Sequence, residues 1–83
     1  MSIIIEYKII GSLKDFYIEN KERFIELEKD SSIEKLLEEL KIDKKFIFRI
    51  DGILVFRNGK SSLLKETLEN GDRIIFAPNL SGG

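Results

Sequence analysis

The chain has 83 residues, 42% of them hydrophobic and 35% charged, which fits a single domain. The chain has 14 lysines and arginines and 15 acidic residues, so its charges nearly cancel. This balance disfavours a nucleic-acid binder, which usually carries a basic excess. Cysteine and histidine are absent, which excludes a disulfide framework, a thiol nucleophile and the usual zinc and iron–sulfur ligand sets.

Neither a membrane-spanning segment nor a signal peptide is indicated by the sequence. No apolar run approaches the roughly 18 residues of a membrane span, and the first residues lack a basic start followed by a long apolar region. We therefore expect a cytoplasmic protein that binds neither nucleic acid nor membrane and holds no metal.

The first part of the chain predicts two strands with a short helical turn between them. Residues 3–10 alternate, so that odd-numbered residues share one face and even-numbered residues the other. Apolar residues at helical spacing in 13–17 predict the helical turn. A second strand is expected over 23–28, with Ile25 and Leu27 facing inward.

The clearest local signal is an amphipathic helix over residues 32–41. Ser31 is expected to cap it, because Glu34 follows at the spacing of a capping box. Apolar residues at i, i+3, i+4 and i+7 predict the face that packs on a core, made by Ile33, Leu36, Leu37 and Leu40.

After the helix, residues 46–50 and 53–57 predict two strands joined by a turn at Asp51-Gly52. Asn58-Gly59 predicts another such turn. The connecting stretch that follows holds three leucines, which are expected to anchor it to the core: Leu63, Leu64 and Leu68.

A last strand is predicted over residues 73–77. It follows a turn at Asn70-Gly71-Asp72 and ends at Pro78, because proline cannot donate a hydrogen bond to a sheet. If Ile74 and Phe76 point at the helix, the alternate side chains point outward, namely Ile75 and Ala77.

This order of elements predicts the α+β class. A helix with one apolar stripe covers one face of a sheet, so four to five strands in a mixed sheet would wrap over one main helix. That is the ubiquitin-like β-grasp arrangement, although the pattern alone also fits other small α+β folds. We expect a domain over residues 1–78 and a flexible tail over 79–83.

The tail reads Leu80-Ser81-Gly82-Gly83 after Asn79. Four extended residues reach roughly 13 Å. The two glycines have no Cβ, so the end should be slim and mobile, which suits a carboxylate that enters a narrow channel of another protein. Taken alone, a terminal Gly-Gly is a weak motif, since chance or a linker scar also produces it.

The context of the tail is more specific. Leu68, Gly71 and Asp72, an apolar strand, Pro78, a short spacer and Gly82-Gly83 form a pattern that resembles the end of the small sulfur-carrier subunit of molybdopterin synthase. The Asn58-Gly59 turn, the segment 9–16 and the helix also resemble that family. The thiazole-pathway sulfur carrier and the ubiquitin-related modifiers share this fold and tail.

Two features of the chain depart from that family. Residues 46–52 are longer than the family needs between helix and strand, and Ala77 stands where the family often has a bulky apolar residue. The second departure indicates that the interface with a large subunit differs here.

The resemblance implies a role for the Gly83 carboxylate. An E1-like adenylating enzyme, using ATP and magnesium, would join it to AMP, and a sulfur donor would displace AMP to leave a thiocarboxylate. The carrier would then deliver sulfur to a precursor on the molybdopterin-synthase large subunit, in molybdenum or tungsten cofactor biosynthesis. The chain itself would be no enzyme, would bind no cofactor and would be a monomer when free.

Docking on these partners is expected to use apolar and slim residues near the tail, namely Gly82, Ser81, Leu80, Ile75, Ala77 and Ile10. Three basic residues either steer the chain toward an acidic partner or form an ordinary solvated surface: Arg57, Lys60 and Arg73.

Other functions stay open at this point. The same Gly83 carboxylate would serve a protein modifier joined to lysines, or a sulfur carrier for thiamine thiazole or tRNA thiolation. A β-grasp interaction domain with an accidental Gly-Gly is a third possibility. An enzyme is the least favoured, because the acidic group of Glu26, Glu28 and Asp30 is typical of surface charge.

Overall fold

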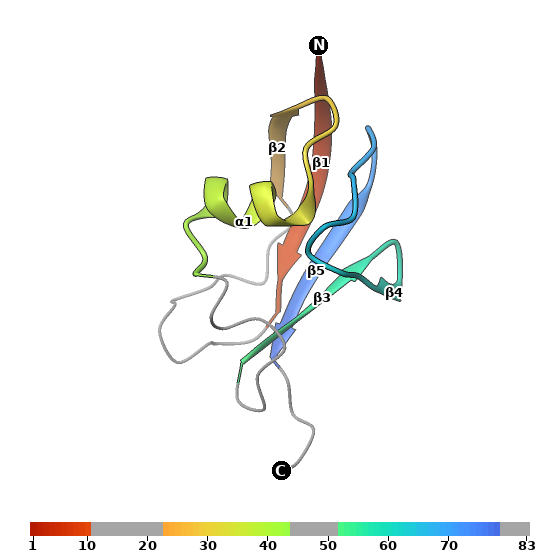
Figure 1. The fold of residues 1–83 in the computed structure, drawn as a ribbon. Coiled ribbons are helices and arrows are strands. Elements are labelled where there is room, and N and C mark those ends of the chain that lie inside the picture. Colours follow the sequence, from red (N-terminus) through yellow and green to blue (C-terminus); the bar gives the residue numbers. More distant parts are fainter. Residues whose placement is uncertain (11–22, 44–51, 79–83) are drawn as a thin grey trace.

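The computed structural model describes residues 1–10, 23–43 and 52–78. These ranges hold five strands and one helix, which are shown in Figure 1. In chain order they are β1 (Ser2–Ile9), β2 (Arg23–Glu28), α1 (Ile33–Leu40), β3 (Ile53–Arg57), β4 (Lys60–Ser61) and β5 (Arg73–Pro78). Across the described ranges, no helix is both long and apolar enough to span a membrane.

Four sequence-based predictions fall wholly or partly outside these ranges. They are the helical turn over 13–17, the strand over 46–50, the turn at Asp51-Gly52, of which only Gly52 is described, and the tail over 79–83.

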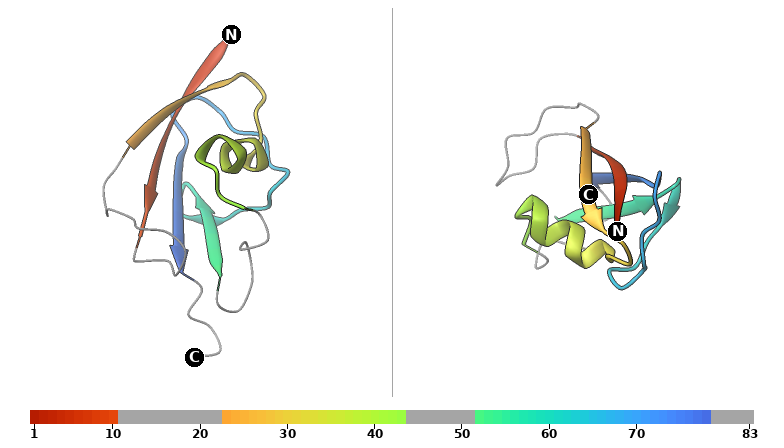
Figure 2. Two further views of the ribbon diagram at one scale, coloured as in Figure 1. Left: turned by 90° about the vertical axis from the view of Figure 1, so that its left-hand side faces the viewer. Right: turned by 90° about the horizontal axis from the view of Figure 1, so that it is seen from above.

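The strands form one mixed sheet in the order β2-β1-β5-β3-β4. The first and last strands of the chain, β1 and β5, run parallel at its centre, and the other neighbouring pairs are antiparallel. Helix α1 covers one face of this sheet, as the two views in Figure 2 show. A mixed sheet over one helix is the β-grasp fold, so the predicted fold class is confirmed.

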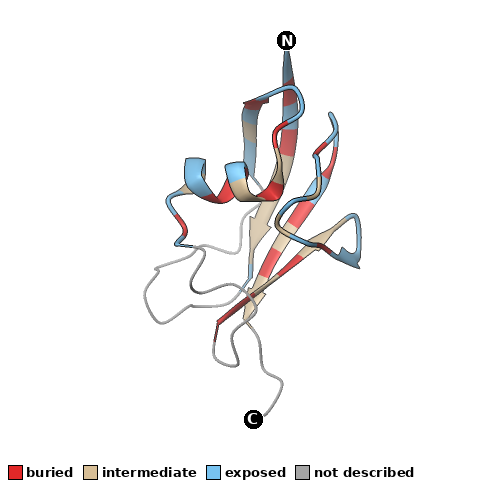
Figure 3. Ribbon diagram, in the orientation of Figure 1, coloured by how far each residue is buried: buried red, intermediate tan, exposed pale blue. Residues whose placement is uncertain are grey.

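Alternation along the strands places the core between the sheet and α1. The buried side chains come from odd-numbered residues of β1 and β2 and even-numbered residues of β5, which agrees with the inward sides expected for β2 and β5. Figure 3 shows buried segments on these strands and on α1. The buried hydrophobic residues are Ile3, Ile5, Leu27, Ile33, Leu36, Leu37, Ile42, Ile53, Val55, Leu68, Ile74 and Phe76.

The helix has the predicted apolar face but a different cap. Ser32 is the N-cap residue, and its Oγ accepts a hydrogen bond from the Lys35 N–H at 3.2 Å. The prediction of Ser31 as the cap is therefore wrong. The Ser31 carbonyl instead accepts a hydrogen bond from the Leu68 N–H at 2.8 Å, which ties the start of the helix to the loop before β5.

Two predictions about strands and anchors also need correction. Pro78 pairs with Ile53 as the last residue of β5, so the strand extends through the proline. Leu63 is 69% exposed and does not anchor the connecting stretch, whereas Leu68 is buried and Leu64 packs against the core. The two-residue strand β4, which follows the predicted Asn58-Gly59 turn, was not predicted.

Candidate functional site

Strand β5 is the element that leads to the Gly-Gly tail. It lies between β1 and β3, and it forms backbone pairs with both neighbours. The tail residues Leu80, Ser81, Gly82 and Gly83 lie outside the described residues. The structure therefore describes β5, the strand that precedes the tail, and the surface beside the end of β5.

The surface beside the end of β5 is a set of apolar side chains on the sheet face opposite α1. Because alternate residues point to opposite faces, the outward residues are those between the buried ones. The registers Leu54↔Ala77 and Phe56↔Ile75 make them neighbours across β3 and β5. Ile10 joins them, because its N–H donates to the Phe76 carbonyl at 2.8 Å. We call this set the tail-side face: Ile10, Leu54, Phe56, Ile75 and Ala77.

The predicted outward residues lie where alternation placed them. Ile75 and Ala77 are half-buried, and Ile10 is 37% exposed. Leu54 and Phe56 were missed in the sequence, although the same alternation in β3, with buried Ile53 and Val55, would have identified them. An apolar, partly exposed surface of this kind suits contact with another protein.

The turn that precedes β5 is held by a cluster of polar side chains around Asp72. One carboxylate oxygen, Oδ2, accepts hydrogen bonds from Arg57 Nε and from the Glu69 N–H, both at 2.8 Å. The other, Oδ1, accepts from the Asn58 amide at 3.0 Å. The Asn58 side-chain oxygen in turn accepts from the Arg73 N–H at 2.9 Å. Hydrogen bonds from and to the Asn58 side chain thus join the Asn58-Gly59 turn to the Gly71-Asp72 turn.

Hydrogen bonding in this cluster stabilises the charged form of its carboxylates. Burial opposes the charge on Asp72, but the bonds from Glu69, Asn58 and Arg57 together lower the pKa of this carboxyl below its ordinary value. The Leu63 N–H, at 2.8 Å, and Arg57 likewise lower the pKa of Glu66. Asp72 is therefore an ionised structural anchor at neutral pH.

The same turn is also fastened to β1. Asn70 accepts a hydrogen bond from the Ile4 N–H through its side-chain oxygen at 2.8 Å, and the Gly71 N–H donates to the Ile4 carbonyl at 2.9 Å. Gly71 has φ +89°, a left-handed conformation that glycine adopts without steric cost. The start of β5 is therefore anchored to strands on both of its sides.

The basic residues considered for steering have different surroundings. Arg57 is partly buried and binds both Asp72 and Glu66, so its charge is neutralised within the domain. Arg73 is exposed and pairs with Glu6 at 3.0 Å, whereas Lys60 is exposed on β4. Arg57 thus contributes to structure instead of to a solvated or steering surface.

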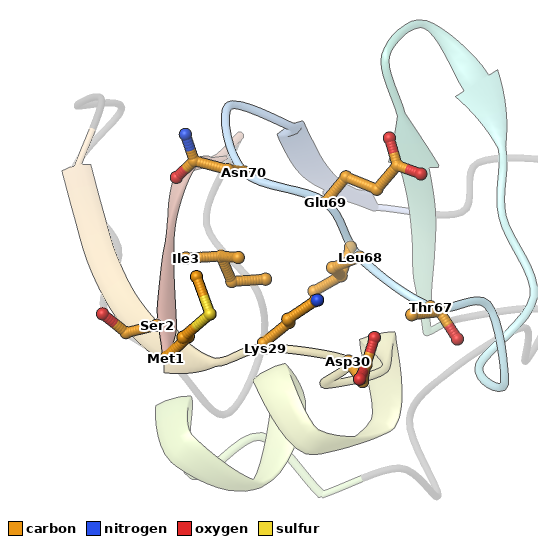
Figure 4. Close-up of a pocket in the computed structure, with 9 residues that line it drawn as sticks. All are labelled: Met1, Ser2, Ile3, Lys29, Asp30, Thr67, Leu68, Glu69 and Asn70. Carbon is orange, nitrogen blue, oxygen red and sulfur yellow. The ribbon is translucent and has the colours of Figure 1, made fainter.

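A hollow of about 520 Å³ lies at the other end of the sheet. Its walls come from the start of β1, the segment between β2 and α1, and the loop before β5, as Figure 4 shows. Met1, Ile3 and Leu68 contribute apolar surface, and Lys29 and Glu69 contribute charged groups. Because β1 and β5 are parallel, the start of β1 is remote from the end of β5, so this hollow is separate from the tail-side face.

Comparison with protein families gives one match over nearly the whole chain. The model of the ThiS family matches residues 7–83, a range that includes β5, the residues of the tail-side face and the Gly-Gly pair. Among curated proteins, none matches the sequence.

Several solved structures have the same fold at low sequence identity. SAMP1 from Haloferax volcanii is 24% identical, with a TM-score of 0.70, over 96% of this chain and 99% of that one. A putative subunit 1 of the molybdopterin converting factor from Pyrococcus furiosus is 22% identical, with a TM-score of 0.73, over 94% and 99%. A complex of subunits 1 and 2 of that factor from Helicobacter pylori matches at 21% identity, with a TM-score of 0.61, over 98% and 100%.

Proposed function

The chain belongs to the ThiS family of ubiquitin-like sulfur carriers, and from this membership we propose that Gly83 carries the sulfur as a C-terminal thiocarboxylate. The observation that carries the proposal is the family match, which extends to residue 83 and so includes the Gly82-Gly83 pair. The turn at Gly71-Asp72, strand β5 and Pro78 precede this pair in the order typical of such carriers.

The proposed chemistry has two steps: activation of the Gly83 carboxylate by ATP, and then replacement of AMP by sulfur. A carboxylate is a poor electrophile, because its charge is shared by two oxygens. On an E1-like adenylating enzyme, one carboxylate oxygen attacks the α-phosphorus of ATP, and pyrophosphate leaves. A hydrosulfide ion supplied by the sulfur donor then attacks the carbonyl carbon, AMP leaves with the bridging oxygen, and the S–H proton is lost. The product is a thiocarboxylate whose sulfur is the better nucleophile.

The catalytic groups for these steps would belong to the partner enzymes, with ATP and magnesium bound there. The chain would act as a protein substrate in the cytoplasm, a monomer when free, and would present Gly83 to each partner in turn. The tail-side face supports this role, because its apolar residues flank the end of β5, from which the tail extends. A partner that packs on Ile75 and Ala77 would hold Gly83 at a fixed reach from its own active site.

For the acceptor we propose the large subunit of a molybdopterin synthase, in molybdenum or tungsten cofactor biosynthesis. The likeness to a complex of subunits 1 and 2 of the molybdopterin converting factor supports a carrier that pairs with a larger subunit. A thiazole-forming enzyme of thiamine synthesis or a tRNA-thiolating enzyme would receive the same thiocarboxylate, so the acceptor has to be tested separately.

The carrier proposal is tested by measuring the intact mass of the protein. The protein is incubated with ATP, its cognate adenylating enzyme and a sulfur donor. We expect a gain equal to the replacement of one oxygen by sulfur, located by fragmentation at Gly83. A variant that lacks Gly83 should keep its fold and show no gain. An unchanged wild-type mass, with an adenylating enzyme shown to form AMP, would rule out the proposal.

The acceptor is tested with the thiocarboxylate form of the protein. It is mixed in parallel with a molybdopterin-synthase large subunit and its precursor, with a thiazole-forming enzyme and its substrates, and with a tRNA-thiolating enzyme and its tRNA. Loss of sulfur from Gly83 in the first mixture alone supports the proposed acceptor. Loss in another mixture alone contradicts it and identifies the alternative pathway.

Protein modification is a second candidate function for the same tail. It is favoured by the fold shared with a small archaeal modifier protein from Haloferax volcanii, at 22% identity and a TM-score of 0.72. In this case a lysine amine of a target would displace AMP and form an isopeptide bond with Gly83. Digestion of cell proteins should then release lysines that carry a remnant of the chain ending in Gly-Gly. The absence of such lysines in cells that contain the activating enzyme would exclude this function.

A further inference from the structure

Strand β2 forms one edge of the sheet, and one side of its backbone is unpaired within the described residues. The Lys29 N–H donates to the Met1 carbonyl at 2.9 Å, in register with the pairs Ile3↔Leu27 and Ile5↔Ile25. Bonded and non-bonded pairs alternate in an antiparallel ladder. The odd-numbered residues of β2 therefore bond to β1, and the even-numbered residues direct their backbone groups away from it.

Three residues of β2 present groups on this open side, namely Phe24, Glu26 and Glu28. Phe24 and Glu26 each offer an N–H and a C=O. Glu28 offers its N–H, because its carbonyl already accepts from the Ser31 N–H at 3.2 Å. These groups form a regular row on which another extended chain could pair.

The side chains of the same residues form a mixed surface on the sheet face opposite α1. Phe24 is 68% exposed, which is unusual for an aromatic residue in a strand. Ile4, which is 45% exposed, lies diagonal to it, because the register pairs Ile4 with Glu26 and Glu6 with Phe24. Glu26 and Glu28 are exposed beside them. The open edge thus combines one apolar spot with two carboxylates.

This edge is distinct from the tail-side face. The tail-side face lies over β3, β5 and the end of β1, whereas Phe24 and the two glutamates lie on β2. The ion pair between Arg73 and Glu6, at 3.0 Å, stands between the two regions on the same side of the sheet. A chain bound along β2 would leave Ile75 and Ala77 accessible.

Charge decides which kind of chain fits this edge. Glutamates on an edge strand discourage pairing with copies of the same strand. Two antiparallel alignments of two copies of β2 overlap equally. One places Glu26 opposite Glu26 of the second copy, and like charges placed opposite each other are destabilising. The other places the apolar Phe24 opposite Glu26, which offers no favourable pair. A basic strand would form favourable pairs at the same positions. Carboxylates alone would protect the edge, but they do not account for the exposed Phe24 on the same strand.

We propose that the open edge of β2 binds an extended basic segment of a partner protein as an additional strand. The partner residues opposite Glu28 and Glu26 are lysine or arginine, and the one opposite Phe24 is apolar. In the antiparallel direction the segment reads basic, any residue, basic, any residue, apolar. This interaction holds a partner against the carrier while the tail-side face and Gly83 stay available, and it is independent of the sulfur chemistry.

The experiment uses the full chain labelled with ¹⁵N and two capped heptapeptides. The basic peptide is Thr-Lys-Val-Lys-Thr-Ile-Thr, and the matched control has glutamate in place of both lysines. With the basic peptide we expect shifts and slowed hydrogen exchange at the amides of Phe24, Glu26 and Glu28. The control peptide should bind about tenfold more weakly, because opposite charges become like charges.

A charge-reversed protein makes the test specific. The double variant Glu26→Lys, Glu28→Lys changes only exposed side chains and should reverse the preference, so that the acidic peptide binds more tightly. The variant Phe24→Thr should weaken both peptides while leaving the dispersion of the spectrum unchanged. Three outcomes would overturn the proposal: no shift at millimolar peptide, shifts confined to Ile75 and Ala77, or dimers of the protein that pair through β2 without peptide.

Discussion

At the scale of single residues, Asp72 shows how a turn motif stabilises the start of β5. Its two carboxylate oxygens accept three hydrogen bonds, from Arg57, Asn58 and Glu69. These donors come from β3, from the turn that follows it, and from the loop before β5. Removing a hydrogen-bonded partner leaves donors that must find water in a partly buried site. Asp72 therefore links segments that are distant in the sequence.

The first prediction concerns the dependence of stability on pH. The folded protein lowers the pKa of Asp72 from an ordinary value of 3.8, so the stabilisation is fully present above that pH and is lost as the pH falls through the lowered value. Asp72→Asn should cost about 2 kcal/mol of unfolding free energy at pH 7. It should also reduce the slope of stability against pH in the acid range, measured by urea unfolding between about pH 2 and 7.

The control for this experiment is Glu28→Gln, which removes a carboxylate from the exposed edge strand. It should leave the stability at pH 7 within about 0.5 kcal/mol of the wild type. An Asp72→Asn curve that parallels the wild type through the acid range would contradict the prediction.

Residue-scale predictions from sequence succeeded where alternation determines the outcome. Ile74 and Phe76 are buried and Ile75 and Ala77 point outward, because a strand has only two faces. The prediction that Leu63 anchors its segment to the core was wrong, because no alternation determines the side to which it points. It lies in a connecting stretch with no regular period, and its type alone does not distinguish it from buried Leu68.

At the scale of elements, the helix shows how far a local signal reaches. The apolar stripe of α1 predicted which residues enter the core, and Ile33, Leu36 and Leu37 are buried. The cap was misassigned by one residue, because Ser31 and Ser32 are both good capping types. A tertiary contact distinguishes them, because the Ser31 carbonyl accepts a hydrogen bond from the N–H of Leu68, a residue much later in the sequence.

The second prediction follows from this cap. Ser32→Ala removes the acceptor for the Lys35 N–H and should lower the free energy of unfolding by about 1 kcal/mol. Ser31→Ala leaves that bond in place and should cost less. Chemical denaturation of both variants checks the order, and an equal or greater loss for Ser31→Ala would show that the cap is not the stabilising feature.

Among the strands, those with a clear apolar alternation were predicted from the sequence, and the short β4 was not. The bounds of β2 and β3 agree with the predicted ranges, since apolar alternation and the Asn58-Gly59 turn delimit them. The two residues of β4 carry no period of their own. They pair with Phe56 and Arg57 only because the turn reverses the chain.

At the scale of the whole molecule, the tail-side face depends on strand order. Ile10, Leu54 and Ala77 are far apart in the sequence, and the β1-β5-β3 arrangement brings them together. The sequence predicted that Ile10, Ile75 and Ala77 point outward, but it predicted no pairing between β1, β3 and β5. The composition of the face therefore needed the structure.

The third prediction tests this face. Ala77→Asp places a carboxylate among its apolar side chains, at a half-buried outward position. Sulfur transfer from the loaded carrier to its acceptor should slow by about tenfold or more, because a charge would be buried in the contact without a partner. The melting temperature should change little. Single-turnover transfer at limiting acceptor concentration measures the effect.

The matched control is Glu38→Lys on the exposed side of α1, away from the tail-side face. Its transfer rate should stay within about twofold of the wild type, because dissolved salt screens the effect of a surface charge that is remote from the contact. If Ala77→Asp transferred sulfur as fast as Glu38→Lys, docking would use a different surface.

The parallel pairing of β1 with β5 has a consequence for how the protein is made. During synthesis, residues 2–9 leave the ribosome long before Arg73–Pro78 exist, so the strand that becomes central to the sheet has no partner on one side. Contacts between such remote segments slow folding, because the intervening chain must first be brought together. We therefore expect nascent chains that stop before β5 to remain sensitive to proteases. Resistance should appear only when that strand has been released from the ribosome.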